Sequence, residues 1–280
     1  MFKKLNILLC ITLLLRACTV ATLEPTQTSA PTLIPSLTPA PWDRDGWNIV
    51  WYDEFDGPEL DRANWNFDIG GNGWGNAEWE VYTDKPENIR IENGILVIEA
   101  REDPTLPAGR PYSSARIKTQ GLHSWTYGRI EARIKLPYGK GLWGAFWMMG
   151  NNNKGWPTSG EIDILEYGKT PDRIYATIHA PGYSGGEGVT GNLVVPAETL
   201  KNDFHLYVIE WQENEIRWLF DEQEYLKLTP ADVPAEWIFD HEFFIIMNLA
   251  VGGRFPGYPD ETTVFPQFMN VDYVRVYQRP

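Results

Sequence analysis

The stretch GEIDILEYG, residues 160–168, places three carboxylates within six residues of a segment that is otherwise typical of a buried β-strand. Side chains alternate between the two faces of a strand, so Glu161 and Asp163 share one face while Glu166 falls on the other. The apolar pair between Asp163 and Glu166 interrupts the alternation. One extra residue there, a β-bulge, returns Glu166 to the face of the other two acids. The stretch therefore predicts a bulged strand that aligns three acids on one face.

Short strand patterns separated by turn residues run through residues 42–280. Asn93 and Gly94 join two such patterns and are typical of a type I′ hairpin turn. No segment of ten or more residues has a helical period, and no repeat of fixed length is present. We therefore expect an all-β protein built as an antiparallel β-sandwich. The clearest strand patterns lie at residues 48–55, 88–101, 114–121, 127–137, 205–211, 215–221, 243–251 and 271–278.

The composition of the chain excludes some partners and favours others. The 280 residues carry a formal net charge of −14 at pH 7, and no basic stretch is present that could neutralise the phosphates of a nucleic acid. The 13 Trp residues offer flat apolar faces that suit stacking on sugar rings, although large β-sheet cores also use Trp. We therefore expect no nucleic acid partner, and we expect the glycine-rich loops 71–78 and 179–188 at the rims of a binding cleft.

The first 17 residues are typical of an export signal. Lys3 and Lys4 precede a largely apolar run, residues 5–15, which is too short to span a membrane comfortably. The run is followed by Leu-Arg-Ala-Cys, which resembles a bacterial lipoprotein box and makes Cys18 the candidate lipidated residue. This interpretation predicts an exported protein that is anchored at the cell surface by lipid and meets the membrane only through that anchor. Ordinary signal-peptidase cleavage, which would give a secreted protein, is the alternative.

Residues 18–41 are rich in Thr, Pro and Ser and nearly free of charge, which predicts a semi-extended tether. The folded domain is expected over residues 42–280. Cys10 lies in the signal segment, so no intrachain disulfide is expected in the processed protein. We expect that protein to be a monomer.

The aligned acids suit one kind of chemistry in particular. Hydrolysis of a glycosidic bond needs one carboxylate as nucleophile or base and a second carboxyl group, kept protonated, as acid. Glu161 and Glu166 on one strand face meet this requirement, and Asp163 between them is able to adjust the protonation of the first by hydrogen bonding. Acids that lie close together also push their pKa values apart. A solvated acidic face and a calcium site are the alternative interpretations, but neither accounts for the bulge.

Several segments of the chain resemble glycoside hydrolase family 16 in its laminarinase-like form. GEIDILEYG is similar to the bulged E-x-D-x-x-E signature of that family, and other blocks follow in the family's order over residues 47–278. The resemblance implies a curved jelly-roll sandwich whose concave face holds a sugar cleft. It also implies retaining, endo-acting hydrolysis of β-1,3-glucan such as laminarin, with no cofactor for catalysis. The other matching blocks are NGWGNAEWEVYT, ENGILVIEAR, SARIKTQG, YGRIEARIKLP, GLWGAFWMMG, IMNLAVGG and VDYVRVYQ.

Residue by residue, the resemblance implies that Glu161 is the nucleophile, Glu166 the acid/base and Asp163 an assisting carboxylate. It also implies a set of substrate-binding residues, which are Trp143, Trp147, Trp156, Glu131, Arg133, Asn76, His179 and Asn248. Each has a structural alternative, because a Trp in an apolar run is more often part of a core, and Glu131 with Arg133 could form a surface ion pair.

A structural calcium ion on the convex side of the sandwich is a further implication of the resemblance. Its ligands would be carbonyl and carboxylate oxygens at Glu54, Gly94 and Asp272, since hard oxygen donors suit this ion.

Two interpretations other than an enzyme remain open, a noncatalytic glycan-binding module and a structural surface protein with a calcium site. A binding module needs aromatic platforms but neither a nucleophile nor a proton donor, so the intact set of three acids favours an enzyme. Within that class, mixed-linkage β-1,3-1,4-glucanase, agarase and carrageenase are the alternatives. Sulfated galactans are the least favoured substrates, because a site for them should gather extra Arg or Lys.

Overall fold

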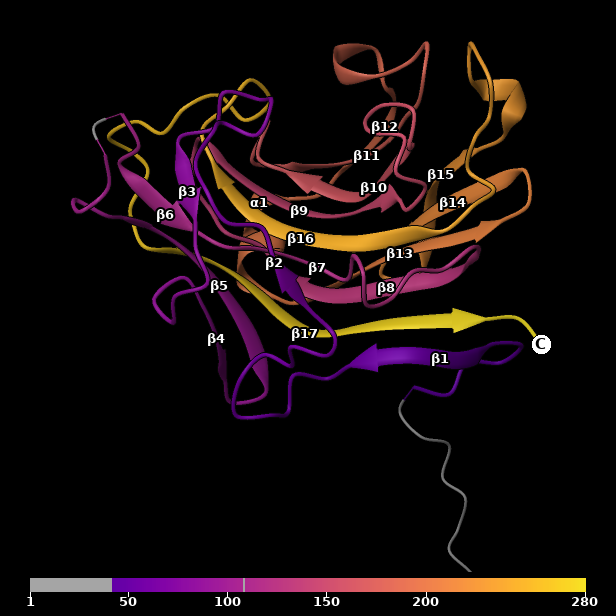
Figure 1. Ribbon diagram of the computed structural model, residues 1–280, viewed down its shortest axis with the longest axis horizontal. Helices are drawn as coiled ribbons and strands as arrows, with labels where there is room; N and C mark the ends of the chain where they lie inside the picture. Colours follow the sequence, from indigo (N-terminus) through magenta and orange to yellow (C-terminus); the bar gives the residue numbers. More distant parts are fainter. Residues whose placement is uncertain (1–41, 108) are drawn as a thin grey trace, which may run out of the picture. The chain divides into compact units, whose positions relative to one another are not determined.

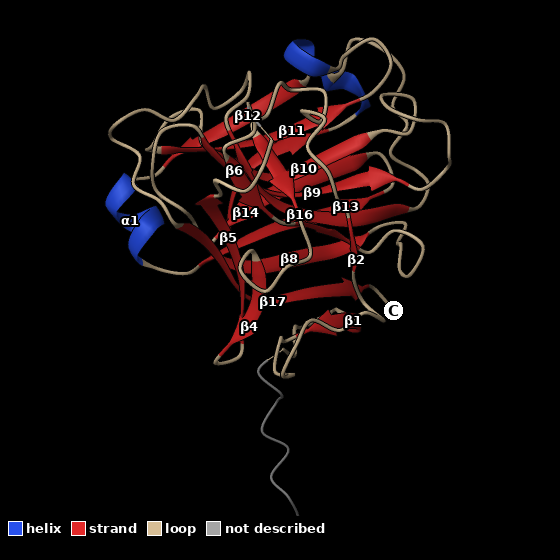
Figure 2. Ribbon diagram, turned by 60° about the vertical axis from the view of Figure 1, so that its left-hand side comes forward, coloured by secondary structure: helices blue, strands red, loops and turns tan. Residues whose placement is uncertain are grey.

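Two β-sheets contain almost all of the regular structure in the computed structural model, which describes residues 42–107 and 109–280 (Figure 1, Figure 2). The expected signal peptide, Cys18 and the tether lie outside the described residues. None of the described helices has the length and hydrophobicity needed to cross a membrane. The helical segments among the described residues are α1 (Ala197–Asn202), η1 (Gly185–Glu187) and η2 (Pro230–Asp232).

The larger sheet has ten strands and is antiparallel except where β3 and β6 pair in parallel at one edge. This short parallel pair joins an otherwise antiparallel sheet at its edge. In order across the sheet the strands are β15 (Gln223–Leu228), β14 (Glu215–Phe220), β13 (His205–Gln212), β8 (Gly128–Lys135), β17 (Gln267–Gln278), β5 (Ile95–Glu102), β6 (Tyr112–Ser114) and β3 (Glu80–Tyr82), with β1 (Asn48–Asp53) paired to β17 and β4 (Ile89–Glu92) paired to β5.

The smaller sheet has seven antiparallel strands. Its long strands bend along their length, so the sheet has a concave face on the side away from the ten-stranded sheet, as β16 shows clearly (Figure 1). In order across the sheet the strands are β12 (Val189–Val194), β11 (Arg173–His179), β10 (Glu161–Tyr167), β9 (Leu142–Gly150), β16 (Phe243–Val251), β7 (Arg116–Lys118) and β2 (Asn66–Phe67).

The two sheets pack together through the apolar residues that alternate along their strands. Phe146 and Ile162 enter this core from the seven-stranded sheet, and Ile130 and Trp218 enter it from the ten-stranded sheet; all four are 0% exposed. Complete burial of one such side chain contributes roughly 1.5–3 kcal/mol. The packing fixes which side of each strand faces inward, and therefore which side chains of the seven-stranded sheet reach the concave face.

The expected curved antiparallel β-sandwich is confirmed. The predicted hairpin is also present, because β4 and β5 are joined by Asn93 and Gly94 with φ angles of 53° and 77°. A type I′ turn requires positive φ at both central positions, and Asn followed by Gly accepts that conformation with little strain.

Candidate active site

The central strand of the site is β10, which lies between β9 and β11 in the seven-stranded sheet. Against β9, Asp163 pairs with Trp147 and Leu165 pairs with Phe146, so Ile164 is the extra residue. Ile164 and Leu165 both belong to the core and are 1% and 0% exposed. The predicted β-bulge is therefore present, and it resets the alternation of the residues that follow it.

The bulge brings the acids of β10 to the same face of the sheet. Thr177 of β11 lies opposite Asp163, and its hydroxyl donates a hydrogen bond to Oε2 of Glu166 at 3.2 Å. Because Thr177 lies opposite Asp163 and contacts Glu166, both acids lie on the same face of the sheet. Asp163 and Glu166 are 3% and 8% exposed, so the two acids are largely shielded from water.

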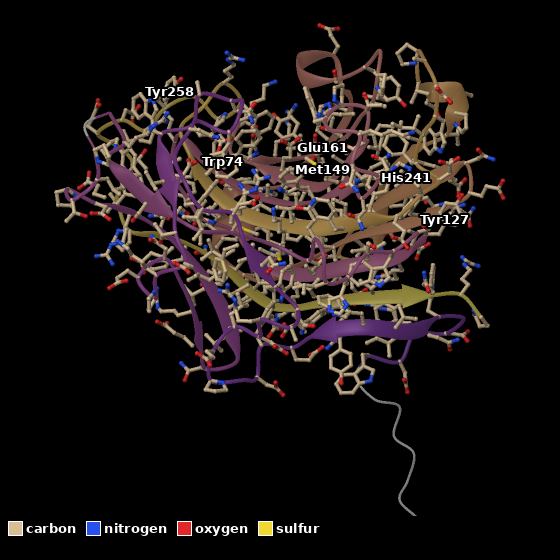
Figure 3. The ribbon with its side chains drawn as sticks, in the orientation of Figure 1. Trp74, Tyr127, Met149, Glu161, His241 and Tyr258 are labelled. Atoms are coloured by element: carbon tan, nitrogen blue, oxygen red, sulfur yellow. The ribbon has the colours of Figure 1, made fainter. Side chains whose placement is uncertain are left out.

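Glu161 begins β10 and lies near the middle of the concave face. It pairs with Met149 of β9, and the two side chains lie between Trp74 at one end and His241 at the other (Figure 3). Glu161 therefore lies between a residue of the loop before β3 and a residue of the loop before β16 in this view.

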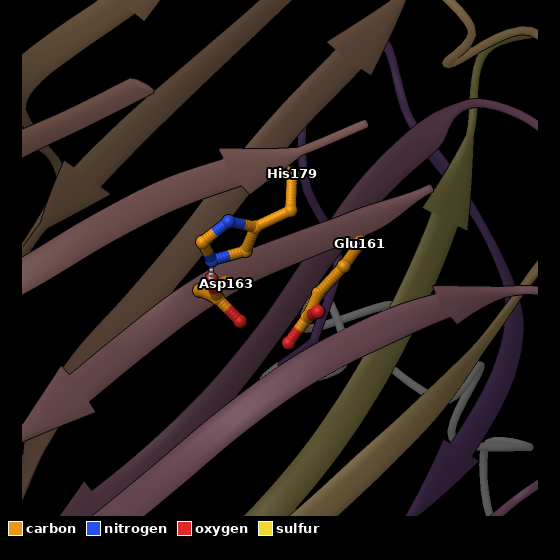
Figure 4. A group of neighbouring side chains, drawn as sticks. All are labelled: Glu161, Asp163 and His179. Atoms are coloured by element: carbon orange, nitrogen blue, oxygen red, sulfur yellow. Dashed lines mark ion pairs between the residues drawn. The ribbon is translucent and has the colours of Figure 1, made fainter. Parts of the chain in front are cut away.

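Glu161 and Asp163 each have a polar side chain close to their carboxylate oxygens. The indole N–H of Trp156 donates a hydrogen bond to the carboxylate of Glu161. Nε2 of His179, on β11, lies 3.3 Å from Oδ2 of Asp163 (Figure 4). The ligand atoms of Glu161, Asp163 and His179 lie within 4.8 Å of one another, and among the described residues they form the group of His, Asp and Glu that could share a metal ion.

Burial raises the pKa of all three acids. Burial, followed by the charge of Asp163, raises the pKa of Glu161 to about 8, while the charge of His179 and the Trp156 hydrogen bond oppose the rise. Burial raises the pKa of Asp163 to about 7. Burial and then the charges of Asp163 and Glu161 raise the pKa of Glu166 well above its usual range. This shift favours the protonated form of Glu166, which is the form that a general acid must have.

A row of hydrogen bonds extends from the acids along the concave face. Trp147 faces Asp163 across β9 and β10, and its indole N–H donates to Oδ1 of Asn248 at 2.8 Å. The amide of Asn248 donates to the hydroxyl of Tyr82 at 3.2 Å. The guanidinium of Arg116 lies 4.8 Å from the centre of the Trp147 ring. Trp147 and Asn248 therefore lie together beside the acids.

The loop before β3 continues this row. The Tyr82 hydroxyl donates to Glu78 at 3.3 Å, and the side-chain amide of Asn76 donates to the same carboxylate at 3.2 Å. The backbone carbonyl of Asn76 accepts a hydrogen bond from the N–H of Arg254 at 2.9 Å, so two loops meet there. Asn76 is connected to the site through these contacts.

The other predicted aromatic residues lie around the same face. Trp143 of β9 stacks on Phe255, with ring centroids 4.9 Å apart, and Phe255 meets the ring of Tyr175 of β11 edge-on. Trp156 is 49% exposed, which leaves much of its ring free beside Glu161. An exposed aromatic surface beside acids of this kind is able to bind a sugar ring through its apolar face.

Glu131 and Arg133 do not belong to this site, and the prediction that they bind substrate is wrong. Both lie on β8 in the ten-stranded sheet. Glu131 is fully buried in ion pairs with Arg44 at 2.9 Å and Arg129 at 2.8 Å, and Arg133 pairs with Asp272 at 2.6 Å. The apolar residues of β8 fill the core, so the charged residues between them point to the convex side, away from the acids of β10.

The three candidate calcium positions meet at β17. Asp272 lies between the part of β17 that pairs with β5 and the part that pairs with β1. Gly94 comes just before β5 and Glu54 just after β1, so both approach the same stretch of β17. Arg275 binds the Glu54 carboxylate at 2.7 and 2.8 Å, and Arg133 binds that of Asp272. Because both carboxylates have arginine partners, backbone carbonyl oxygens are the better candidates for calcium ligands here.

Residues of the site that were not assigned a role from the sequence include Tyr82, Arg116 and Thr177. Thr177 lies two residues before His179 on one strand, so period-two alternation could have found it. No local pattern indicates Tyr82, because its contact with Asn248 joins positions 166 residues apart.

Comparison with known proteins agrees with this geometry. Residues 76–275 match the family model described as glycosyl hydrolases family 16. The chain is 43% identical over 246 residues to a beta-glucanase of Rhodothermus marinus, covering 83% of this chain and 85% of that protein. The laminarinase catalytic domain of Thermotoga maritima MSB8 superposes with a TM-score of 0.79 at 48% identity, covering 84% of this chain and 100% of that one. The endo-beta-1,3-glucanase of Pyrococcus furiosus gives a TM-score of 0.79 at 45% identity, with 84% and 95% covered.

Proposed function

The chain belongs to glycosyl hydrolase family 16, and from this premise we propose that it is an endo-acting, retaining hydrolase of β-1,3-glucan. The observation that carries the proposal is the bulge of β10, which presents Glu161, Asp163 and Glu166 together on the concave face. The similarity to a laminarinase and to an endo-beta-1,3-glucanase supports β-1,3-glucan as the substrate.

The proposed reaction is a double displacement. Glu161 attacks the anomeric carbon in its ionised form, which the charge of His179 and the Trp156 hydrogen bond favour. At the same time Glu166 gives its proton to the glycosidic oxygen, so the bond to the leaving sugar breaks and a covalent glycosyl-enzyme forms. Glu166, now a carboxylate, takes a proton from a water molecule that attacks the same carbon and displaces Glu161. The released sugar has the original anomeric configuration. Asp163 and His179 adjust the protonation of Glu161 through their charges.

The sugar chain is proposed to lie along the concave face. Trp143, Trp147 and Trp156 would contact the apolar faces of the sugar rings, and Asn76, His179 and Asn248 would bind their hydroxyl groups. No cofactor takes part in the proposed chemistry.

An assay of residues 42–280 tests the proposal. Laminarin, barley mixed-linkage glucan and agarose are offered separately, and new reducing ends are measured together with the anomer that first appears by NMR. We expect the highest kcat/KM on laminarin and β-anomeric product. A higher kcat/KM on mixed-linkage glucan would make that polysaccharide the preferred substrate and would not affect the proposed mechanism. An α-anomeric product would exclude double displacement.

We also propose that the protein is exported and anchored by lipid at Cys18, since the residues before it resemble a lipoprotein box. Labelled fatty acid should appear on the wild-type protein and be absent from Cys18→Ala. A wild-type protein that never acquires the label would favour simple secretion.

A structural calcium ion at Glu54, Gly94 and Asp272 is our proposal for the convex side. The convergence of these positions at β17 supports it, with backbone carbonyl oxygens as the principal ligands. Such an ion would stabilise the fold without entering the reaction.

A further inference from the structure

A buried hydrogen bond joins the ten-stranded sheet to the catalytic strand. Trp218 of β14 is 0% exposed, and its indole N–H donates to the backbone carbonyl of Asp163 at 2.8 Å. Because β14 and β10 belong to different sheets, this bond crosses the core of the sandwich.

The acceptor carbonyl belongs to the peptide unit at which the bulge begins. Asp163 pairs regularly with Trp147 and Thr177, and the register of β10 shifts directly after it against both neighbouring strands. A strand carbonyl normally accepts from an adjacent strand, but a bulge interrupts that ladder. A buried carbonyl without a donor is strongly unfavourable, so a donor from outside the sheet stabilises the backbone at such a break in the ladder. Trp218 supplies it.

We propose that Trp218 is a positioning residue for the acid/base Glu166. Its indole holds the first peptide of the bulge toward the core, and the bulge determines where Glu166 stands relative to Glu161. Without the N–H, that peptide is free to turn toward the ladder and the residues after it shift. Glu161 lies before the bulge and keeps its pairing with Met149. This inference rests on the proposed function, in which Glu166 protonates the leaving group.

The same sheet contains a matched control. Trp211 of β13 is 1% exposed, and its indole N–H donates to the backbone carbonyl of Phe239 at 3.0 Å. Trp218→Phe and Trp211→Phe each remove one buried indole-to-carbonyl hydrogen bond and the same ring atoms. Only Trp218 has its acceptor in the catalytic strand. Similar decreases in melting temperature are expected for the two variants, so a general loss of stability affects both.

Two substrates separate positioning of Glu166 from other effects. Hydrolysis of laminarin requires a proton donor, whereas an aryl β-laminaribioside with a good leaving group forms the glycosyl-enzyme without one. The ratio kcat/KM reports the first irreversible step, which is formation of that intermediate. We expect Trp218→Phe to lower kcat/KM on laminarin by about tenfold, mainly through kcat, and by less than about twofold on the aryl substrate. Trp211→Phe should change both by less than about twofold.

Equal behaviour of Trp218→Phe and Trp211→Phe on both substrates would overturn the inference, and so would an equal loss on laminarin and on the aryl substrate. A wild-type protein inactive on laminarin would instead reject the proposed function, which keeps the two failures distinct. If Trp218→Phe does not fold, benzothienylalanine at position 218 keeps the bicyclic ring and replaces only the N–H. That protein should show the same selective loss on laminarin, and unchanged activity would likewise refute the inference.

Discussion

Glu161 and Glu166 have the same functional group, but their proposed roles predict different products in one rescue experiment. Glu161→Gly leaves a gap opposite the leaving group, so added azide should attack there and give an α-glycosyl azide from an activated β-glycoside. Glu166→Ala still forms the covalent intermediate from such a substrate, so azide should intercept it and give the β-glycosyl azide. NMR of the anomeric proton distinguishes the two products.

Without azide, both variants should hydrolyse laminarin slower by several orders of magnitude, because each lacks a group that acts directly in bond making or breaking. Glu213→Gln, in the exposed turn between β13 and β14, is the control and should retain wild-type activity. A β-glycosyl azide from the Glu161 variant together with an α-glycosyl azide from the Glu166 variant would mean that Glu166 is the nucleophile and Glu161 the acid/base.

The raised pKa of Glu161 also predicts how stability changes with pH. The carboxyl group ionises near pH 4 in the unfolded chain, but burial in the folded protein raises its pKa to about 8. The folded state therefore binds more protons between these values, and the stability contributed by the protonated group is lost as the pH rises through that window. Glu161→Gln removes the effect. Its melting temperature relative to wild type should rise between pH 4 and pH 8, by about 2–4 °C for each kcal/mol that the wild type loses over that range.

Glu213→Gln again serves as the control, because it removes an equal charge from an exposed position. Its melting temperature should stay parallel to that of the wild type over the same pH range. Parallel curves for Glu161→Gln as well would mean that burial of this acid does not govern the pH dependence of stability.

At the scale of the strand, deletion of Ile164 tests what the bulge does. The shortened sequence reads Glu, Ile, Asp, Leu, Glu, Tyr, which alternates with strict period two, so the acids stay on the concave face and the apolar residues stay in the core. The strand becomes regular, and Glu166 keeps its place opposite Ala145 of β9 but loses the local backbone bend that the bulge gives it. We expect a folded protein with a lower melting temperature and kcat/KM on laminarin reduced by about tenfold or more.

The deletion also tests whether Trp218 acts through the bulge. In a regular strand no bulge remains for Trp218 to hold, so Trp218→Phe should cause no further loss of kcat/KM in the deletion background. Such non-additivity is expected of residues that act through one structural feature. The same fractional loss in both backgrounds would show that Trp218 acts independently of the bulge.

The bulge could be predicted from the sequence because it depends on spacing within one strand, where Glu161, Asp163 and Glu166 fix the pattern. Membership of a sheet could not be predicted in the same way. Glu131 and Arg133 alternate with apolar residues as cleft residues would, but the alternation says only that one face of β8 is buried, and not which sheet contains it. The contact between Trp218 and Asp163 has no local signal either, because 55 residues separate the two positions.

At the scale of the whole sandwich, the two outward faces carry different kinds of side chain. The concave face gathers acids and aromatic rings around β10. The convex face of the ten-stranded sheet holds ion pairs, in which Arg129 binds Glu131, Glu210 and Glu222 at 2.8–3.0 Å. Removing one member of a buried ion pair is strongly destabilising, because the other charge remains buried without a partner. Substitutions on the convex face are therefore expected to alter stability, and substitutions around β10 to alter catalysis.

Calcium binding at β17 belongs to this convex side and predicts a change in stability without a change in chemistry. An ion that binds only the folded state stabilises it by about 2.7 kcal/mol when its concentration is a hundred times the Kd. Calcium should therefore raise the melting temperature of residues 42–280, and a chelator should lower it. The value of kcat on laminarin should be the same in both conditions, because Asp272 and Glu161 lie in different sheets.

Asp272→Ala and Arg133→Ala distinguish the effect of calcium binding from the effect of the ion pair between these two residues. Both variants break that ion pair, whose atoms lie 2.6 Å apart. Only Asp272→Ala also removes a carboxylate from the proposed calcium site. The calcium-dependent rise in melting temperature should therefore persist in Arg133→Ala, where the freed Asp272 carboxylate is available to the ion, and should be smaller in Asp272→Ala, which keeps the backbone carbonyl ligands. A melting temperature that does not respond to calcium or chelator in the wild type would exclude the site, and an equal response in both variants would exclude the Asp272 side chain as a ligand.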